Sequence, residues 1–103
     1  TGLIVDDHQM VRTAIAEIIA REDDIKVVGE TGDGRSAVGM AATLRPDVVT
    51  LDIAMPGLNG LDAVRQILRG SPTSRVLMLS AYEDPFFIGH AVEAGVDGYL
   101  SKR

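Results

Sequence analysis

Short apolar runs that alternate with helix-periodic segments constrain the fold of this chain most. Three of the runs are almost continuously apolar: 3–5, 48–51 and 76–79. Such runs are typical of parallel strands buried on both faces, because half-exposed antiparallel strands alternate apolar and polar residues. The pattern predicts an α/β fold, a doubly wound five-stranded parallel sheet with helices on both faces.

Apolar spacing and turn residues predict where the elements lie. The expected strands are 3–5, 25–28 ending at Gly29 or Glu30, 47–51, 75–79 and 96–100. The expected helices are 8–21, one from Arg35 that stops before Pro46, one with its inner face at 61–68, and one from Pro85 capped by Gly95. Proline ends the second of these helices because it cannot continue a helix.

Size and charge limit the function. With 103 residues the chain is one domain, 1–103, and its net charge of −5 argues against direct nucleic-acid binding. No apolar run reaches the roughly 18 residues of a membrane span. There is no cysteine and no basic leader. A cytoplasmic protein without a membrane partner is the expectation.

Polar residues stand where the predicted strands end. They are Asp6, Asp7, Asp52, Ser80 and Lys102. The carboxyl ends of parallel strands open on one crevice, where ligands of such sheets bind. Three carboxylates, a hydroxyl and an ammonium suit a divalent cation such as Mg²⁺ together with a phosphoryl group.

A glycine motif offers an alternative. The segment 32–37 fits G-x-G-x-x-A, and Asp52 follows at the end of the next strand, as in dinucleotide-binding units. The simpler interpretation is a tight turn with Asp33 or Ser36 as helix cap. The dinucleotide reading leaves most of the strand-end residues without a role.

Single residues of the crevice also have structural interpretations. Asp6 and Asp7 could cap the first helix, and Lys102 could be a solvated surface lysine. Two histidines, His8 and His90, lack a second nitrogen or sulfur ligand nearby, so both are expected to be surface or packing residues.

Taken together, the motifs resemble the receiver domain of two-component response regulators. They are Asp6-Asp7, Asp52 with Met55-Pro56 and Gly60, Ser80-Ala81, and Tyr99-Leu100-Ser101-Lys102. Further segments resemble the LuxR/NarL-type branch: Val28-Gly29-Glu30, Gly32-Asp33-Gly34, Arg45-Pro46-Asp47 and Gly98-Tyr99-Leu100.

The resemblance implies a flavodoxin-like sheet of order 2-1-3-4-5. It also implies that Asp52 is the phosphoacceptor, taking a phosphoryl group from a sensor histidine kinase. Mg²⁺ would be held by Asp7, Asp52 and the backbone carbonyl of Ala54, and Asp6 would orient a metal-bound water.

Other roles follow from the same resemblance. Lys102, Ser80 and the Ala81 amide would bind the phosphoryl group, and Ser80 with Tyr99 would form the switch. The switch would change the face of the fourth and fifth strands. Ala54 and Tyr82 would tune dephosphorylation, which is expected to be slow because alanine cannot position an attacking water.

The implied partners are a sensor histidine kinase and, after phosphorylation, a second copy of the domain. A fifth helix is expected after Arg103, and DNA would be bound only through a helix-turn-helix output domain outside this chain. The domain would catalyse only its own phosphorylation and dephosphorylation. Two alternatives are a haloacid-dehalogenase-type phosphatase, which needs an aspartate where Ala54 stands, and a nucleotide or flavin site.

Overall fold

The computed structural model describes residues 1–52, 60–80 and 85–101. Of Ser80, 85–87 and Ser101 only the backbone is described. The strands are β1 (Gly2–Val5), β2 (Val27–Thr31), β3 (Val48–Asp52), β4 (Arg75–Ser80) and β5 (Gly98–Ser101). The helices are α1 (Gln9–Ala20), α2 (Gly34–Leu44), α3 (Gly60–Gly70) and α4 (Pro85–Ala94).

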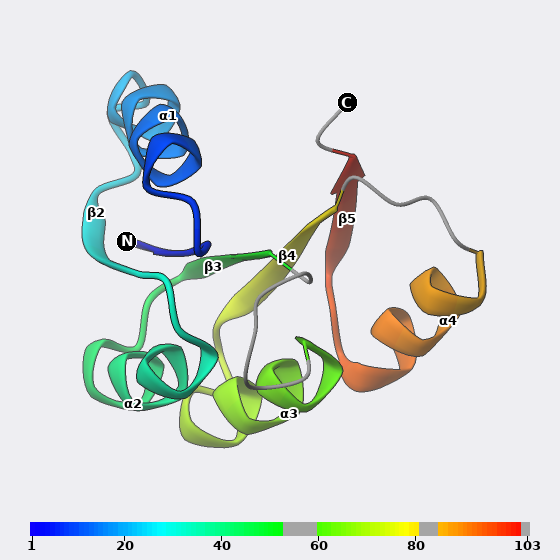
Figure 1. Cartoon of the computed structure of the whole chain (residues 1–103). Helices are drawn as coiled ribbons and strands as arrows, with labels where there is room; N and C mark the ends of the chain where they lie inside the picture. Colours follow the sequence, from blue (N-terminus) through cyan, green and yellow to red (C-terminus); the bar gives the residue numbers. More distant parts are fainter. Residues whose placement is uncertain (53–59, 81–84, 102–103) are drawn as a thin grey trace.

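The five strands form one parallel sheet in the order β2-β1-β3-β4-β5. This confirms both the parallel sheet and the flavodoxin-like order. Helix α1 lies on one face, while α2 and α3 pack side by side on the other, with α4 next to α3 (Figure 1). The carboxyl ends of β1, β3 and β4 therefore meet at one edge.

The hydrophobic core fills the space between the sheet and the three helices α2, α3 and α4. Strand residues such as Leu3, Leu51 and Met78 meet Ala41 of α2 and Ile67 of α3, and all five are fully buried. Alanines on α2 and α3 let these helices approach the sheet closely. The core thus fixes the strands whose ends carry the polar residues.

The opposite face of the sheet is less covered. Beside α1, the described residues leave an apolar groove of about 280 Å³, lined by three isoleucines of α1 and by β3, β4 and β5 residues. Leu100 is 53% exposed at its rim.

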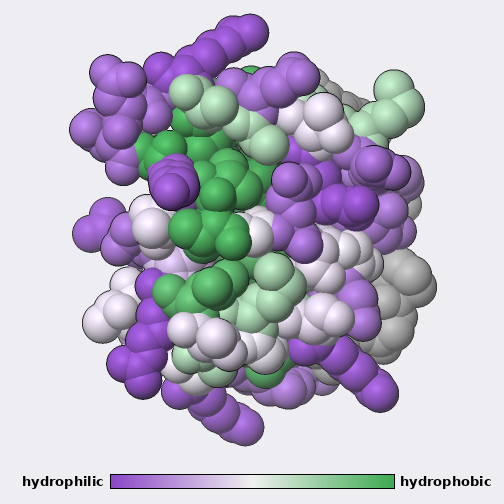
Figure 2. Space-filling view, turned by 90° about the vertical axis from the view of Figure 1, so that its left-hand side faces the viewer, coloured by the Kyte–Doolittle hydropathy of each residue, from purple (hydrophilic) through white to green (hydrophobic). Residues whose placement is uncertain are grey.

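The β2 edge of the sheet carries a band of hydrophobic side chains between hydrophilic ones (Figure 2). Ile25, Val27 and Val28 are half-buried in this region. Among the described residues, no helix is long and apolar enough to cross a bilayer.

Two predicted strand starts were wrong by two residues. β2 begins at Val27 rather than Ile25, because it pairs with β1 from Gly2↔Val27 onward and Ile25 belongs to the preceding turn. β5 begins at Gly98 rather than Val96, because pairing with β4 starts there.

Helix ends follow the expected signals. Asp33 caps α2, its carboxylate accepting a hydrogen bond of 3.0 Å from the Arg35 amide. Arg45 before Pro46 leaves helical geometry with φ 45°. Gly95 follows α4 with φ 112°, a conformation that favours glycine.

Candidate functional site

The site begins with two neighbouring carboxylates at the ends of β1 and β3. The strands pair with Val5 opposite Leu51, so Asp6, just past β1, and Asp52, the last residue of β3, lie on adjacent strands. Their exposed fractions are 0% and 2%. Close buried carboxylates repel each other when both are ionised, so this arrangement favours a cation beside them.

Hydrogen bonds to Thr31, Arg12 and His8 hold Asp6 in place. Its amide donates to the Thr31 carbonyl over 3.0 Å, and its own carbonyl accepts from Arg12 Nη1 over 2.5 Å. Its carboxylate Oδ1 accepts from the His8 amide over 2.9 Å. Asp6 therefore links β1 to β2 and to the start of α1.

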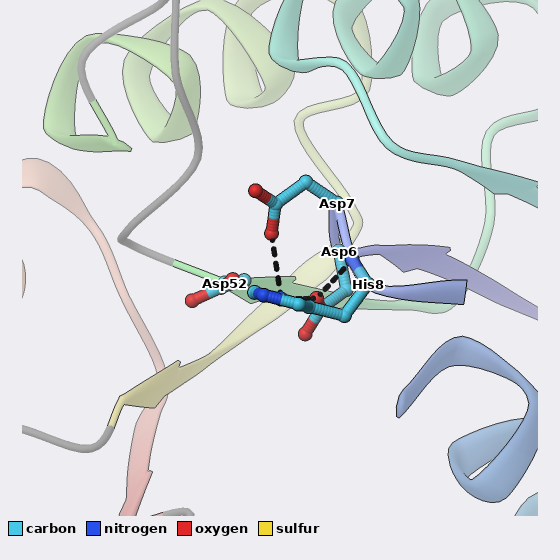
Figure 3. Close-up of side chains that lie close together, drawn as sticks. All are labelled: Asp6, Asp7, His8 and Asp52. Atoms are coloured by element: carbon cyan, nitrogen blue, oxygen red, sulfur yellow. Dashed lines mark hydrogen bonds and ion pairs between the residues drawn. The ribbon is translucent and has the colours of Figure 1, made fainter. Parts of the chain in front are cut away.

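Asp7 is the more accessible acid. Its side chain is 28% exposed, and its Oδ1 lies 2.9 Å from Nδ1 of His8. The same ring nitrogen lies 3.2 Å from Oδ1 of Asp6. Figure 3 shows these side chains converging at the strand ends with Asp52.

The four side chains form one group of possible ligands. One ligand atom from each of Asp6, Asp7, His8 and Asp52 lies within 4.8 Å of the others. Three carboxylates are the oxygen ligands that hard divalent cations take. The donor set therefore fits a divalent cation.

The structure brings together the three aspartates predicted to form the metal site. Ser80 is the last residue of β4, opposite Ser101 of β5, and Tyr99 is half-buried against the core. Ala54, Ala81, Tyr82 and Lys102 lie outside the described residues. Their assigned roles stay predictions.

His8 is the residue that the sequence interpretation missed. It was assigned to the surface or to packing, and its side chain is indeed 65% exposed. Its ring nevertheless lies against two of the site's carboxylates. The signal available was its position directly after Asp6-Asp7, at the N-cap of α1.

The glycine motif has a structural explanation. Besides the Asp33 cap, a Cβ on Gly32 would lie 3.0 Å from Arg12 Nη1, 3.3 Å from Asp7 Cα and 3.4 Å from the Asp6 carbonyl oxygen. Glycine thus lets the loop after β2 approach the acidic residues closely. This favours the turn interpretation over the dinucleotide one.

Comparison with known families decides between the alternatives. The profile of the response regulator receiver domain matches residues 3–103. The chain belongs to the response regulator receiver family. Receivers are signalling phosphoacceptors rather than enzymes that turn over external substrates, so the phosphatase and nucleotide-site alternatives lose their support.

Relatives of this receiver are bacterial regulators. Response regulator GacA of Pseudomonas viridiflava is 40% identical over 100 residues, which cover 97% of this chain and 47% of GacA. Transcriptional regulatory protein DegU of Brevibacillus brevis is 38% identical over 101 residues, covering 98% and 43%. The receiver spans about half the length of these curated relatives.

A solved structure supports the branch. The signal receiver domain of the putative response regulator NarL from Mycobacterium tuberculosis superposes with a TM-score of 0.90 at 31% identity, covering 98% of this chain and 82% of that one. This confirms the resemblance to LuxR/NarL-type receivers.

Proposed function

We propose that this receiver is a phosphorylation-activated switch in which Asp52 accepts a phosphoryl group from a sensor histidine kinase. A carboxylate oxygen of Asp52 attacks the phosphorus of a phosphohistidine. The P–N bond breaks, the imidazole leaves with the electron pair and takes up a proton, and an aspartyl phosphate forms.

The observation that carries this proposal is the position of Asp52. It ends a central strand beside Asp6 and Asp7, at the edge of the sheet where parallel α/β folds bind their ligands. Its low exposure of 2% excludes most water from the carboxylate. An attacking carboxylate would thus be held in place by the strand itself.

The metal site is proposed around the same residues. Asp7, Asp52 and the Ala54 carbonyl would hold Mg²⁺, and Asp6 would orient a bound water. When bound, the cation supplies positive charge that offsets the charge of the carboxylates and of the incoming phosphoryl oxygens. Asp6 suits an orienting role because its carboxylate is already bonded to the His8 amide.

The remaining residues of the proposed switch lie at or near the carboxyl ends of β4 and β5 in the sequence. Lys102 would pair with phosphoryl oxygens as a point charge, and Ser80 with the Ala81 amide would hydrogen-bond them. Inward rotation of Tyr99 would then change the β4–β5 face that partners read. The pairing of β4 with β5 supports this link between Ser80 and Tyr99. Tyr99 lies opposite Met78, and Met78 is two residues before Ser80 on β4.

The signalling partners are proposed with it. Phosphorylation would favour a homodimer. It would also act on a DNA-binding output domain and so control transcription, and the protein would be cytoplasmic. We also propose slow self-dephosphorylation, tuned by Ala54 and Tyr82. Decay of the phosphorylated domain within seconds would contradict that part.

Incubation with acetyl phosphate and Mg²⁺, followed by intact-mass measurement, tests the assignment. The parent protein should gain one phosphate, and Asp52→Asn should gain none. Asp47→Asn is the matched control, because Asp47 is an exposed acid at the opposite end of β3 and should leave the adduct unchanged. No adduct on the parent, or equal adducts on the parent and Asp52→Asn, would overturn the proposal.

A further inference from the structure

The imidazole of His8 points into the acidic cluster instead of capping its helix. His8 is the N-cap residue of α1, with φ −99° and ψ 111°, yet its side chain makes no cap hydrogen bond. Its Nδ1 lies instead 2.9 Å from Asp7 Oδ1 and 3.2 Å from Asp6 Oδ1. A nitrogen atom that could bind a metal therefore lies among the carboxylate oxygens.

One cation could contact all of these atoms after a small inward movement of the ligands. Metal–ligand distances of about 2.0–2.2 Å put neighbouring ligands of an octahedron about 3 Å apart and opposite ones about 4.2 Å apart. The Nδ1–Oδ1 separations of 2.9 and 3.2 Å are close to the shorter value, and they are also hydrogen-bond distances, so a bound cation would take the place of a proton between these atoms. Separations up to 4.8 Å across the whole group need only a small inward movement.

Accessibility also suits a ligand. The His8 side chain is 65% exposed and that of Asp7 is 28% exposed, whereas Asp6 is buried. A hydrated cation can thus reach Nδ1 and the Asp7 carboxylate from solvent without opening the core. The His8 backbone is meanwhile held by the Asp6 carboxylate, which limits where the ring can go.

We propose that His8 Nδ1 is a further ligand of the cation site and that it biases the site toward borderline divalent cations such as Zn²⁺ and Co²⁺. The proposal rests on the proposed function for the cation at Asp7 and Asp52. Imidazole suits zinc and other transition metals, whereas carboxylate, carbonyl and water suit Mg²⁺. Nδ1 in place of a water oxygen in the coordination shell changes which cation binds best.

The second histidine provides an internal comparison. His90 on α4 lies near the carboxylate of Glu93, with Nδ1 3.8 Å from Glu93 Oε2, and both side chains are well exposed. That pair is an ordinary helix-surface contact between residues three apart. His90→Asn therefore controls for the general loss of a surface histidine.

The test is titration of the whole chain and of two variants with Zn²⁺ and, separately, with Mg²⁺. His8→Asn removes the imidazole and keeps a residue favoured at helix N-caps. It should weaken Zn²⁺ binding at least about tenfold, a loss seen even for groups that only support a ligand. Mg²⁺ affinity should change far less, and His90→Asn should bind both cations like the parent.

A direct readout is the imidazole ¹⁵N spectrum. On addition of Zn²⁺ the Nδ1 resonance of His8 should shift, and that of His90 should not. Unchanged Zn²⁺ affinity in His8→Asn, or an unshifted His8 Nδ1, would overturn the proposal. The phosphate adduct formed on Asp52 with Mg²⁺ is a separate measurement, so loss of that adduct in the parent would count against the proposed function alone.

Discussion

Arg12 donates a hydrogen bond from Nη1 to the backbone carbonyl of Asp6 over 2.5 Å. The donor comes from the first turn of α1 and the acceptor from the residue that follows β1. Nε of the same guanidinium also lies 3.9 Å from Oε1 of Glu30 in β2. One side chain thus joins α1 to β2 and to Asp6, the residue that follows β1.

Replacing Arg12 with methionine should lower the free energy of unfolding by about 1.5–3 kcal/mol, since hydrogen bonds to charged groups contribute that much. The Asp6 carbonyl would lose a partner, and the cluster would be less well positioned. Chemical denaturation measures the change. Arg21→Met, at the exposed C-cap of the same helix, should have a small effect, and an equal loss in both variants would contradict the role of Arg12.

A divalent cation should stabilise the fold through the acidic cluster. At a Mg²⁺ concentration about 100 times the dissociation constant, binding to the folded state adds about 2.7 kcal/mol to the unfolding free energy. Asp7→Asn should remove most of this gain, because the cation loses a ligand. The same change should stabilise the metal-free protein, because one of three close negative charges is gone. Thermal unfolding with Mg²⁺ or with a chelator measures both effects.

Asp24→Asn serves as the control for the loss of one negative charge, since Asp24 lies in the exposed turn after α1. It should keep the full Mg²⁺ effect. Stabilisation that survives in Asp7→Asn would place the cation elsewhere.

Thr50 places a hydroxyl inside the sheet at a cost. It lies in the middle of β3 with 9% exposure, and among the described residues its Oγ1 has no hydrogen-bond partner. Thr50→Val should raise the unfolding free energy by about 1–2 kcal/mol, because an unpaired buried polar group is removed. Thr31→Val should not, since the Thr31 hydroxyl accepts from the Asp33 amide; a loss of stability in Thr50→Val would show that its hydroxyl is satisfied.

Two buried serines join the loops at the amino ends of β3 and β4. The Ser74 hydroxyl donates to the Pro46 carbonyl and shares a 2.6 Å hydrogen bond with Ser71. Ser74→Ala should cost about 1–3 kcal/mol, because two buried polar groups lose a partner. Thr73→Ala, at the exposed neighbouring position, should cost little. Urea unfolding compares them, and similar losses would count against the buried network.

Two glycines should respond to alanine in opposite directions. Gly95 has φ 112°, and a Cβ there would lie 2.6 Å from Leu68 Cδ1. Gly95→Ala should destabilise the domain by about 1–3 kcal/mol through strain and crowding. Gly39 lies inside α2 with nothing within 4 Å of a Cβ, so Gly39→Ala should stabilise by about 0.4–1 kcal/mol. Melting temperatures that move in the same direction would contradict this.

Most of the fold could be predicted because burial is periodic. Continuous apolar strands revealed a parallel sheet, and helix spacing located α1 to α4 within a few residues. The start of β2 could not be predicted locally. Ile25 and Val27 are both β-branched residues suited to a strand, and only pairing with β1 decides between them.

The part of the site that lies at the ends of the strands could be predicted from the sequence. Asp6, Asp7 and Asp52 were recognised because parallel strands bring their carboxyl ends together, and the structure groups them. His8 was missed because its ring direction depends on the turn made by the Asp6 carboxylate with the His8 amide. Sequence spacing alone carries no information about that turn.

The strand order also sets when the site can form during synthesis. β1, which is made before the other four strands of this sheet, is an inner strand that pairs with β2 from Val27 and with β3 from Val48. Asp6 and Asp7 emerge early, but their neighbour Asp52 arrives only with the last residue of β3. Such non-local pairing is slow to form. A nascent chain that ends before β3 would carry two of the acids and no complete cluster, so cation binding would report that the central strands have joined.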